Sequence, residues 1–412
     1  MYMKDVLPNG VCIITEAIPY LNSATIGIWV NAGTKSETGE NNGISHFIEH
    51  LMFKGTKNRS AKDIAEIMDG VGGHLNAFTE KEQTCYYAKV MHKHVPLAMD
   101  VLCDMLLNSA FPQDEIEKEQ GVVIEEIKMY EDAPDEKIYD IFTKTLWDGH
   151  PLGRPTLGSQ KIIQGIGRKD IVGFIKKHYT PDNIIVVAVG RVEHQRIVNQ
   201  LEKLLSGMKG TCKYREQTVP IRAERKVEFK DCEQVYLCLG ANGVSQRDDN
   251  RYQLTVLDSI LGGSMSSRLF QEIREKYGLV YSVSSFQIPF KNAGIFGVYA
   301  STGPKNIQSV IELVLKIFKD IQRKGVTERE LTTAKEHLKG SIALALESST
   351  NRMIRSAKSE IYHGRQISHR EVVKKINAVK KRDVQMLARQ ILDENKMSFA
   401  VLGPVNGSTK LW

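Results

Sequence analysis

Apolar residues recur along the chain with two spacings, one typical of amphipathic helices and one typical of strands. Helical spacing predicts helices over residues 44–54, 62–71, 95–107, 113–131, 136–147, 195–205, 251–261, 305–323 and 328–346. Short apolar runs predict strands over residues 11–14, 25–30, 86–90, 184–189, 235–239, 295–299 and 397–402. Strands come early and late in each half, with long helices between them. This grouping favours an α+β fold in which helices pack on a mostly antiparallel sheet, built twice.

An internal repeat supports two equivalent halves. Residues 163–190 fall on residues 376–403 without a gap, and Asp170 meets Asp383 in that alignment. Both copies read as a short helix led by the aspartate, then a turn, then an apolar strand. A looser match joins the starts of the halves, over residues 26–33 and 236–243. An ungapped stretch with the same predicted elements indicates a duplication.

The boundary between the halves follows from composition. Residues 208–225 are rich in Gly, Lys, Arg and Pro, which is typical of an exposed linker. We therefore expect an N-terminal domain over residues 1–207 and a C-terminal domain over residues 226–412.

Composition excludes several classes of protein. The 412 residues are 42% hydrophobic and 25% charged, which is ordinary for globular domains and unlike disordered or fibrous chains. No apolar run spans a bilayer, and the N-terminus lacks a signal-peptide pattern. The net charge of +7 is scattered, without the basic and aromatic stripe of a nucleic-acid site. The six cysteines form no CxxC pair. These features predict a cytoplasmic protein with no membrane or nucleic-acid partner.

The strongest candidate chemistry lies in the segment 43–51, Gly-Ile-Ser-His-Phe-Ile-Glu-His-Leu. His46 and His50 are four residues apart, so on a helix they share a face and can bind one Zn²⁺. Glu49 can reach the same pocket and accept a proton from water held there. HxxEH is the pattern of inverted zinc peptidases, although two unrelated helix-surface histidines could also produce it.

A catalytic zinc site needs a third protein ligand, and the predicted helix 113–131 offers glutamates. Glu115, Glu119 and Glu126 lie on one helical stripe beside an apolar stripe that should pack on the core. Spacing alone does not choose among them, and a solvated acidic face is the alternative.

With these motifs the chain resembles the pitrilysin/insulysin superfamily of inverted zinc peptidases, in particular the mitochondrial-processing-peptidase branch and its bacterial processing proteases. The family's glutamate ligand follows HxxEH at the distance that separates His50 from Glu126, and its second acidic residue, seven earlier, falls on Glu119. Further family context matches at residues 31–33, 53–56, 151–155 and 181–183. The resemblance implies Zn²⁺ on His46, His50 and Glu126, and two halves that close like a clamshell over an extended peptide.

The resemblance also implies a substrate-binding edge strand within residues 72–79. An edge strand presents unpaired backbone groups to which a peptide can add. The family pattern places Asn76, Ala77 and Phe78 at the substrate.

The second half lacks HxxEH, and the segment 251–261, which corresponds to the metal helix, is expected to place apolar residues at the ligand positions. It is therefore expected to bind no metal. Arg274 and Tyr281 match an Arg and Tyr pair of the family, which implies that they hold the scissile carbonyl. A surface Arg and a core Tyr are the alternative.

Together these observations predict a zinc endopeptidase that cleaves unfolded peptides or presequence-like segments inside a closed cavity. Its expected catalytic residues are Glu49, Glu119, Arg274 and Tyr281. Family members of this size pair, so a homodimer is expected. The rival predictions are a non-catalytic core or assembly subunit of the same fold, and a hydrolase of non-peptide substrates.

Overall fold

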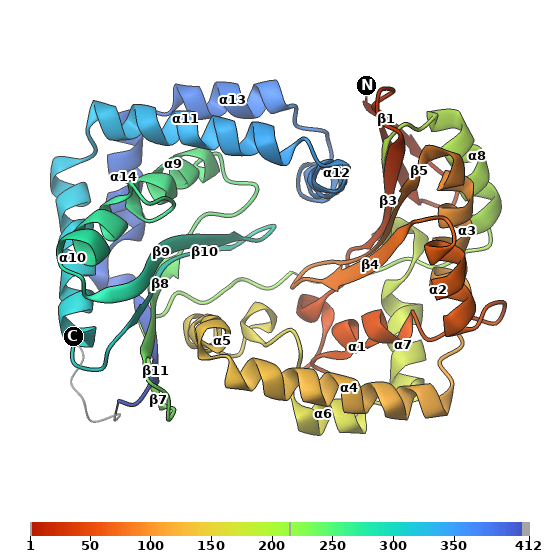
Figure 1. Ribbon diagram of the computed structural model, residues 1–412, viewed down its shortest axis with the longest axis horizontal. Coiled ribbons are helices and arrows are strands. Elements are labelled where there is room, and N and C mark those ends of the chain that lie inside the picture. The colour runs from red at the N-terminus through yellow and green to blue at the C-terminus, as the bar shows by residue number, and fades with distance from the viewer. Residues whose placement is uncertain (1, 214–215, 406–412) are drawn as a thin grey trace. The chain divides into compact units, whose positions relative to one another are not determined.

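The computed structural model describes residues 2–213 and 216–405, which form two compact units (Figure 1). Unit 1 contains the described residues up to 129, those of the range 154–216, and residues 345–366. Unit 2 contains residues 130–153, residues 217–344 and the described residues from 367 onward. Each unit is thus assembled from segments that are far apart in the sequence.

Unit 1 is built on a six-stranded sheet with the order β1-β2-β6-β3-β5-β4. Its strands are β1 (Tyr2–Val6), β2 (Cys12–Ala17), β3 (Ser23–Val30), β4 (His74–Thr79), β5 (Thr84–Met91) and β6 (Ile184–Gly190). Neighbouring strands are antiparallel except β2 and β6, which are parallel. β4 lies at one edge of the sheet, and its outer side has no strand partner among the described residues.

Unit 2 repeats this arrangement in a five-stranded sheet with the order β7-β11-β8-β10-β9. Its strands are β7 (Arg225–Phe229), β8 (Val235–Asn242), β9 (Val280–Pro289), β10 (Gly294–Thr302) and β11 (Ser398–Gly403). Only β7 and β11 are parallel, as β2 and β6 are in unit 1. The order β2-β6-β3-β5-β4 therefore matches β7-β11-β8-β10-β9 strand for strand. The predicted α+β fold with two homologous halves is confirmed.

The repeat extends to helix caps and turns. Helices α7 (Arg168–His178) and α14 (Lys381–Ile391) each have an aspartate as their third residue, which accepts the backbone N–H three residues earlier. β6 and β11 both end at a glycine of positive φ, Gly190 at 130° and Gly403 at 154°. A Cβ on Gly190 would lie 2.4 Å from the Ser23 carbonyl oxygen, so a side chain cannot be accommodated there.

One face of each sheet carries the main helical layer and the larger core. Besides α7, unit 1 contains the helices α1 (Ile44–Leu51), α2 (Ala61–Asp69), α3 (Val95–Asn108), α4 (Gln113–Asp132), α6 (Gln160–Gly165) and α8 (His194–Leu205). Besides α14, unit 2 contains the helices α9 (Arg251–Leu261), α10 (Ile307–Lys324), α11 (Glu328–Ala345) and α13 (His369–Ala378). Figure 1 shows α2, α3 and α8 on one side of the first sheet, and α9, α10 and α14 on one side of the second.

The opposite faces are covered by one helix each, and these two helices are exchanged between the halves. Helix α12 (Ser349–His363) comes from the second half of the chain and packs on β6 and β3 of unit 1. Helix α5 (Pro134–Leu146) comes from the first half and packs on β11 and β8 of unit 2. Because both faces of the first sheet are covered, all seven residues of β6 are buried.

The exchange means that the compact units differ from the continuous domains expected from the sequence, 1–207 and 226–412. An amphipathic pattern shows that a helix has an apolar face, but it does not say which sheet that face covers. The linker over residues 208–225 and the domain boundaries at residues 207 and 226 stay predictions. They refer to the two repeated halves of the sequence and not to the compact units.

Within the described residues, no helix is long and apolar enough to cross a membrane.

Candidate metal centre

Helix α1, which carries the two histidines, is fixed at its N-terminus by an unusual cap. Its N-cap residue Gly43 has a φ of 97°, and a Cβ there would lie 2.6 Å from the Leu157 carbonyl oxygen. The buried Glu37 carboxylate accepts hydrogen bonds from the Gly43 N–H at 2.8 Å and the Ser45 N–H at 2.9 Å. Burial raises the pKa of Glu37, while these hydrogen bonds act in the opposite direction. The Glu37 carboxyl group, by capping these backbone N–H groups, therefore sets where α1 begins and which way it points.

The structure brings His46, His50 and Glu126 together, with one ligand atom of each within 4.8 Å of the others. The Glu126 Oε2 atom lies 3.7 Å from His46 Nε2 and 3.5 Å from His50 Nε2. Ligands at about 2.0–2.1 Å from a tetrahedral zinc stand roughly 3.3–3.4 Å apart. Two imidazole nitrogens and one carboxylate oxygen, converging at nearly this separation, are a donor set that suits Zn²⁺.

The surroundings shift the two imidazoles in opposite directions. Burial and the neighbouring His50 lower the pKa of His46 to about 4. Burial also disfavours the charged form of His50, but hydrogen bonds to Glu119 and Glu126 outweigh it and raise the His50 pKa to about 9. Without a metal, the positive charge of the pair therefore resides on His50. A cation bound between the rings would displace that proton.

Glu119 contacts the Nδ1 atom of His50, while the Nε2 atom of the same ring faces Glu126. Glu119 also forms an ion pair with Lys54. Its Oε2 atom accepts a hydrogen bond from His50 Nδ1 at 3.1 Å, and its Oε1 atom lies 2.6 Å from Lys54 Nζ. Burial raises the pKa of Glu119, but His50 and Lys54 outweigh it, and the net pKa is lowered. Glu119 is only 3% exposed, so these two contacts, rather than water, stabilise its ionised form. Lys54, just beyond α1, was not predicted as a site residue, although it lies within the family-context segment 53–56.

We expect Glu119→Gln to weaken zinc binding by about 10- to 100-fold, because the neutral amide holds the His50 ring less firmly. Competition with a fluorescent zinc chelator measures the affinity. Glu115→Gln is the matched control, since Glu115 lies on the same helical stripe but pairs with Lys118 near the surface. Equal affinities in both variants would contradict the orienting role.

Glu49 lies beside the three candidate ligands without joining them. Its Oε2 atom accepts a hydrogen bond from Thr79 Oγ1 at 2.5 Å, and Thr79 is the last residue of β4. Burial raises the pKa of the Glu49 carboxyl, and the Thr79 hydrogen bond partly offsets that rise. Thr79 was also missed from the sequence, because a contact between a helix and a strand 30 residues away leaves no local pattern.

The predicted substrate strand forms as β4 at the edge of the first sheet. Asn76 is exposed, and its side-chain oxygen accepts the Ala77 N–H at 2.8 Å. The Phe78 ring packs against Trp29, with ring centroids 5.4 Å apart, and so is engaged within the sheet. An open backbone edge is present, while substrate contacts at Asn76, Ala77 and Phe78 stay predictions.

Unit 2 holds Arg274 and Tyr281. The Tyr281 side chain is 74% exposed, so the alternative of a core tyrosine is wrong. The Arg274 guanidinium lies over the Phe270 ring, 4.8 Å from its centroid, within the π-helical turn Phe270–Lys276. Their role at a substrate carbonyl stays a prediction.

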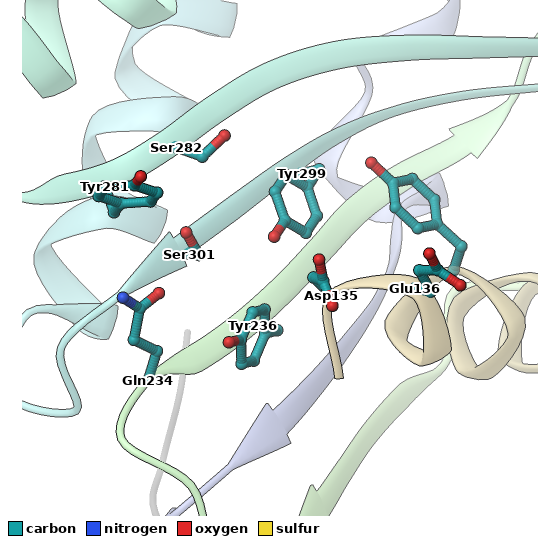
Figure 2. A pocket seen from close by; sticks show the side chains of 9 residues that line it. Asp135, Glu136, Gln234, Tyr236, Tyr281, Ser282, Tyr299 and Ser301 are labelled. Carbon is teal, nitrogen blue, oxygen red and sulfur yellow. The ribbon is translucent and has the colours of Figure 1, made fainter. Parts of the chain in front are cut away.

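Tyr281 lines a pocket of about 540 Å³ formed by α5, β9, β10 and the start of β8 (Figure 2). The pocket's lining is rich in hydroxyl groups and carboxylates: Asp135, Glu136, Tyr139, Gln234, Tyr236, Tyr281, Ser282, Tyr299 and Ser301. No basic side chain is among these lining residues.

In unit 2, α9 takes the place of the metal helix. With Asp258 aligned on Glu49, the two histidine positions hold Thr255 and Ser259, so the expectation of apolar residues there is wrong. Asp258 of α9 is largely buried and accepts a hydrogen bond from Ser285 Oγ of β9 at 2.5 Å. Burial raises the pKa of Asp258. Asp258 is one of several polar residues of α9, so the amphipathic pattern of the helix did not single it out.

The family comparison agrees with this geometry. Residues 12–160 match the model of insulinase (peptidase family M16), and residues 165–338 match that of the peptidase M16 inactive domain. The chain belongs to the M16 peptidase family, which is the pitrilysin-type superfamily expected from the sequence.

Relatives cover almost the whole chain. It is 40% identical to the zinc protease YmxG of Bacillus subtilis, over 98% of both chains. It is 39% identical to a zinc protease of Streptomyces coelicolor, over 98% of this chain and 89% of that one. The fold is similar to a protease from Helicobacter pylori, with a TM-score of 0.92 at 23% identity, covering 98% of this chain and 99% of that one.

Proposed function

We propose that this protein is a zinc-dependent endopeptidase that cleaves unfolded peptides or presequence-like segments within an enclosed cavity. The observation that carries the proposal is the convergence of His46, His50 and Glu126 on one point, with the Glu49 carboxylate beside it. The M16 family and the zinc proteases among its relatives support a peptidase role.

His46, His50 and Glu126 would hold the zinc ion, and Glu119 would orient His50. When bound, zinc supplies a Lewis acid that polarises the scissile carbonyl and lowers the pKa of water. Glu49 then accepts the proton of the attacking water and later passes it to the nitrogen of the leaving amine. The open edge of β4 offers backbone groups with which an extended substrate can pair.

Other parts of the proposal rest on the family resemblance. Arg274 and Tyr281 are proposed to hold the scissile carbonyl, and the exposure of Tyr281 is compatible with that role. Pairing of two copies into a homodimer and a cytoplasmic location stay predictions.

A non-catalytic assembly subunit of the same fold is the rival proposal. Such a subunit has no need for three metal ligands and a proton acceptor in register. Here all four side chains are present, and Glu119 and Lys54 hold one ligand in place. This complete set favours the enzyme.

The proposal predicts that cleavage of a mixed library of unfolded peptides stops when the metal is removed. We expect 1,10-phenanthroline to abolish cleavage, stoichiometric Zn²⁺ to restore it, and elemental analysis to find about one zinc per chain. His46→Ala is the control, because it should lose the metal and the activity together. Full cleavage by the metal-free protein would refute zinc dependence. Zinc binding without cleavage of any peptide would favour the assembly subunit.

A further inference from the structure

The two halves share a contact between a helical carboxylate and a hydroxyl group on the edge strand. In unit 1, Thr79 Oγ1 of β4 donates to Glu49 Oε2 of α1 at 2.5 Å. In unit 2, Ser285 Oγ of β9 donates to Asp258 Oδ1 of α9, also at 2.5 Å. None of the expected metal ligands takes part in either contact.

These contacts occupy equivalent places. β4 and β9 are the corresponding edge strands of the two sheets, and α1 and α9 are the helices that pack on them. Around Glu49, the residues three before and one after are His46 and His50. Around Asp258, the same positions hold Thr255 and Ser259. The carboxylate–hydroxyl contact is therefore present in a half that has no histidines at the two equivalent positions.

Because this carboxylate–hydroxyl contact occurs in both halves, its structural role can be distinguished from a role in positioning the proton acceptor. In unit 2 the contact can only tie the edge strand to the helix. In unit 1 the same tie also fixes the side chain that the proposed function uses as the proton acceptor. Without it, the Glu49 carboxylate could rotate away from the point where His46 and His50 converge, because no other side-chain hydrogen bond to Glu49 is found among the described residues.

The direction of the hydrogen bond follows from the acceptor, because a carboxylate has no proton to donate. Thr84, fully buried on β5, donates its own proton to the Ala32 carbonyl oxygen at 2.9 Å, so its Oγ1 atom could only accept from Thr79. That atom lies 3.4 Å from Thr79 Oγ1, whereas Glu49 Oε2 lies at 2.5 Å. The shorter contact to the charged acceptor therefore takes the Thr79 proton.

We propose that Thr79 is a positioning residue for peptide cleavage, which holds the Glu49 carboxylate in its working orientation and links it to the strand expected to bind substrate. This inference rests on the proposed function. It predicts a loss in the chemical step, with no loss in zinc binding.

The test compares Thr79→Val, Thr79→Ser and Ser285→Ala in the full-length zinc-loaded protein. Valine has nearly the shape of threonine without the hydroxyl, so Thr79→Val should lower kcat roughly 10- to 100-fold, as expected for a hydrogen bond to a charged group. KM and the one-zinc stoichiometry should not change, and Thr79→Ser should recover most of kcat. Ser285→Ala removes the matching contact in unit 2, which contains none of the expected ligands, so it should lower the melting temperature but not kcat.

A double-mutant cycle shows whether Thr79 acts through Glu49. In a Glu49→Gln background, Thr79→Val should have no further effect on the residual rate. If Thr79→Val does not fold, Thr79→Ala takes its place in every comparison.

Several results would overturn the inference. These are an unchanged kcat in Thr79→Val, loss of zinc from that variant, an equal fall of kcat in Ser285→Ala, or additive effects in the cycle. In each of these cases the wild-type protein would still cleave peptides. Failure of the proposed function itself would appear instead as a wild-type protein that cleaves no peptide.

Discussion

Glu49→Gln is expected to lower the kcat of peptide cleavage by about 10²-fold or more while the protein keeps its zinc. Glutamine has nearly the same shape and can still accept the hydrogen bond from Thr79, which joins the two side chains at 2.5 Å. What it cannot do is take a proton from water. His46, His50 and Glu126 do not include Glu49, so the metal should stay.

The measurement pairs steady-state cleavage of a fluorogenic peptide with zinc analysis of the same sample. Glu125→Gln serves as the control, because Glu125 precedes Glu126 but pairs with Lys128 on the exposed side of α4. It should keep both activity and zinc. If Glu49→Gln loses its zinc in proportion to its activity, Glu49 is a ligand and the assigned role is wrong.

A fragment that ends at Gly207 is expected to misfold, although it contains every expected metal ligand. It lacks α12, which covers one face of the first sheet. Trp29 and Met353 are both fully buried in that layer, with Trp29 Nε1 donating to Met353 Sδ at 3.1 Å. Without α12, the fragment exposes a large apolar face and leaves Trp29 in water.

Polar contacts add to that apolar layer. Thr25 and Ser349 share a buried hydrogen bond of 2.9 Å, and Arg352 pairs with Glu16 at 2.5 Å. We therefore expect the fragment to aggregate or to bind the dye ANS, as measured by light scattering and fluorescence.

Adding the missing helix back as a peptide tests whether its absence causes the misfolding. Adding residues 345–366 as a separate peptide should restore a cooperative melting transition and shift the tryptophan emission to shorter wavelength. The same peptide with Met353→Asp should fail, since it would bury a charge beside Trp29. A fragment that folds and binds zinc without the peptide would show that the covering helix is dispensable.

Much of the fold was visible in the sequence where the signal is local. The ungapped repeat predicts α7 with β6, and α14 with β11, and the structure gives both copies the same aspartate cap and the same terminal glycine. The exchange of α5 and α12 was not visible, because a helix pattern carries no information about which distant sheet it covers.

The residues of the candidate site also divide into those with a local sequence signal and those without one. His46 and His50 follow from one helical turn, whereas spacing alone left Glu126 among several glutamates of one stripe. The family pattern selected Glu126, and the structure places it at the histidines. Lys54, Thr79 and Glu37 act through contacts that depend on how strands and helices meet, so no sequence spacing pointed to them.

The exchange of α12 also determines when unit 1 can complete its fold during synthesis on the ribosome. The last element of unit 1 within the first half, α8, ends at Leu205, but α12 ends only at His363. At about 5–20 residues per second, the ribosome needs roughly 10–30 s to make the chain in between. During that time the first sheet has one apolar face uncovered, so unit 1 cannot finish folding until most of the second half has been made. The nascent chain is therefore prone to aggregate during this interval, and a truncated product would be an aggregation-prone half-domain rather than a folded unit with a formed metal centre.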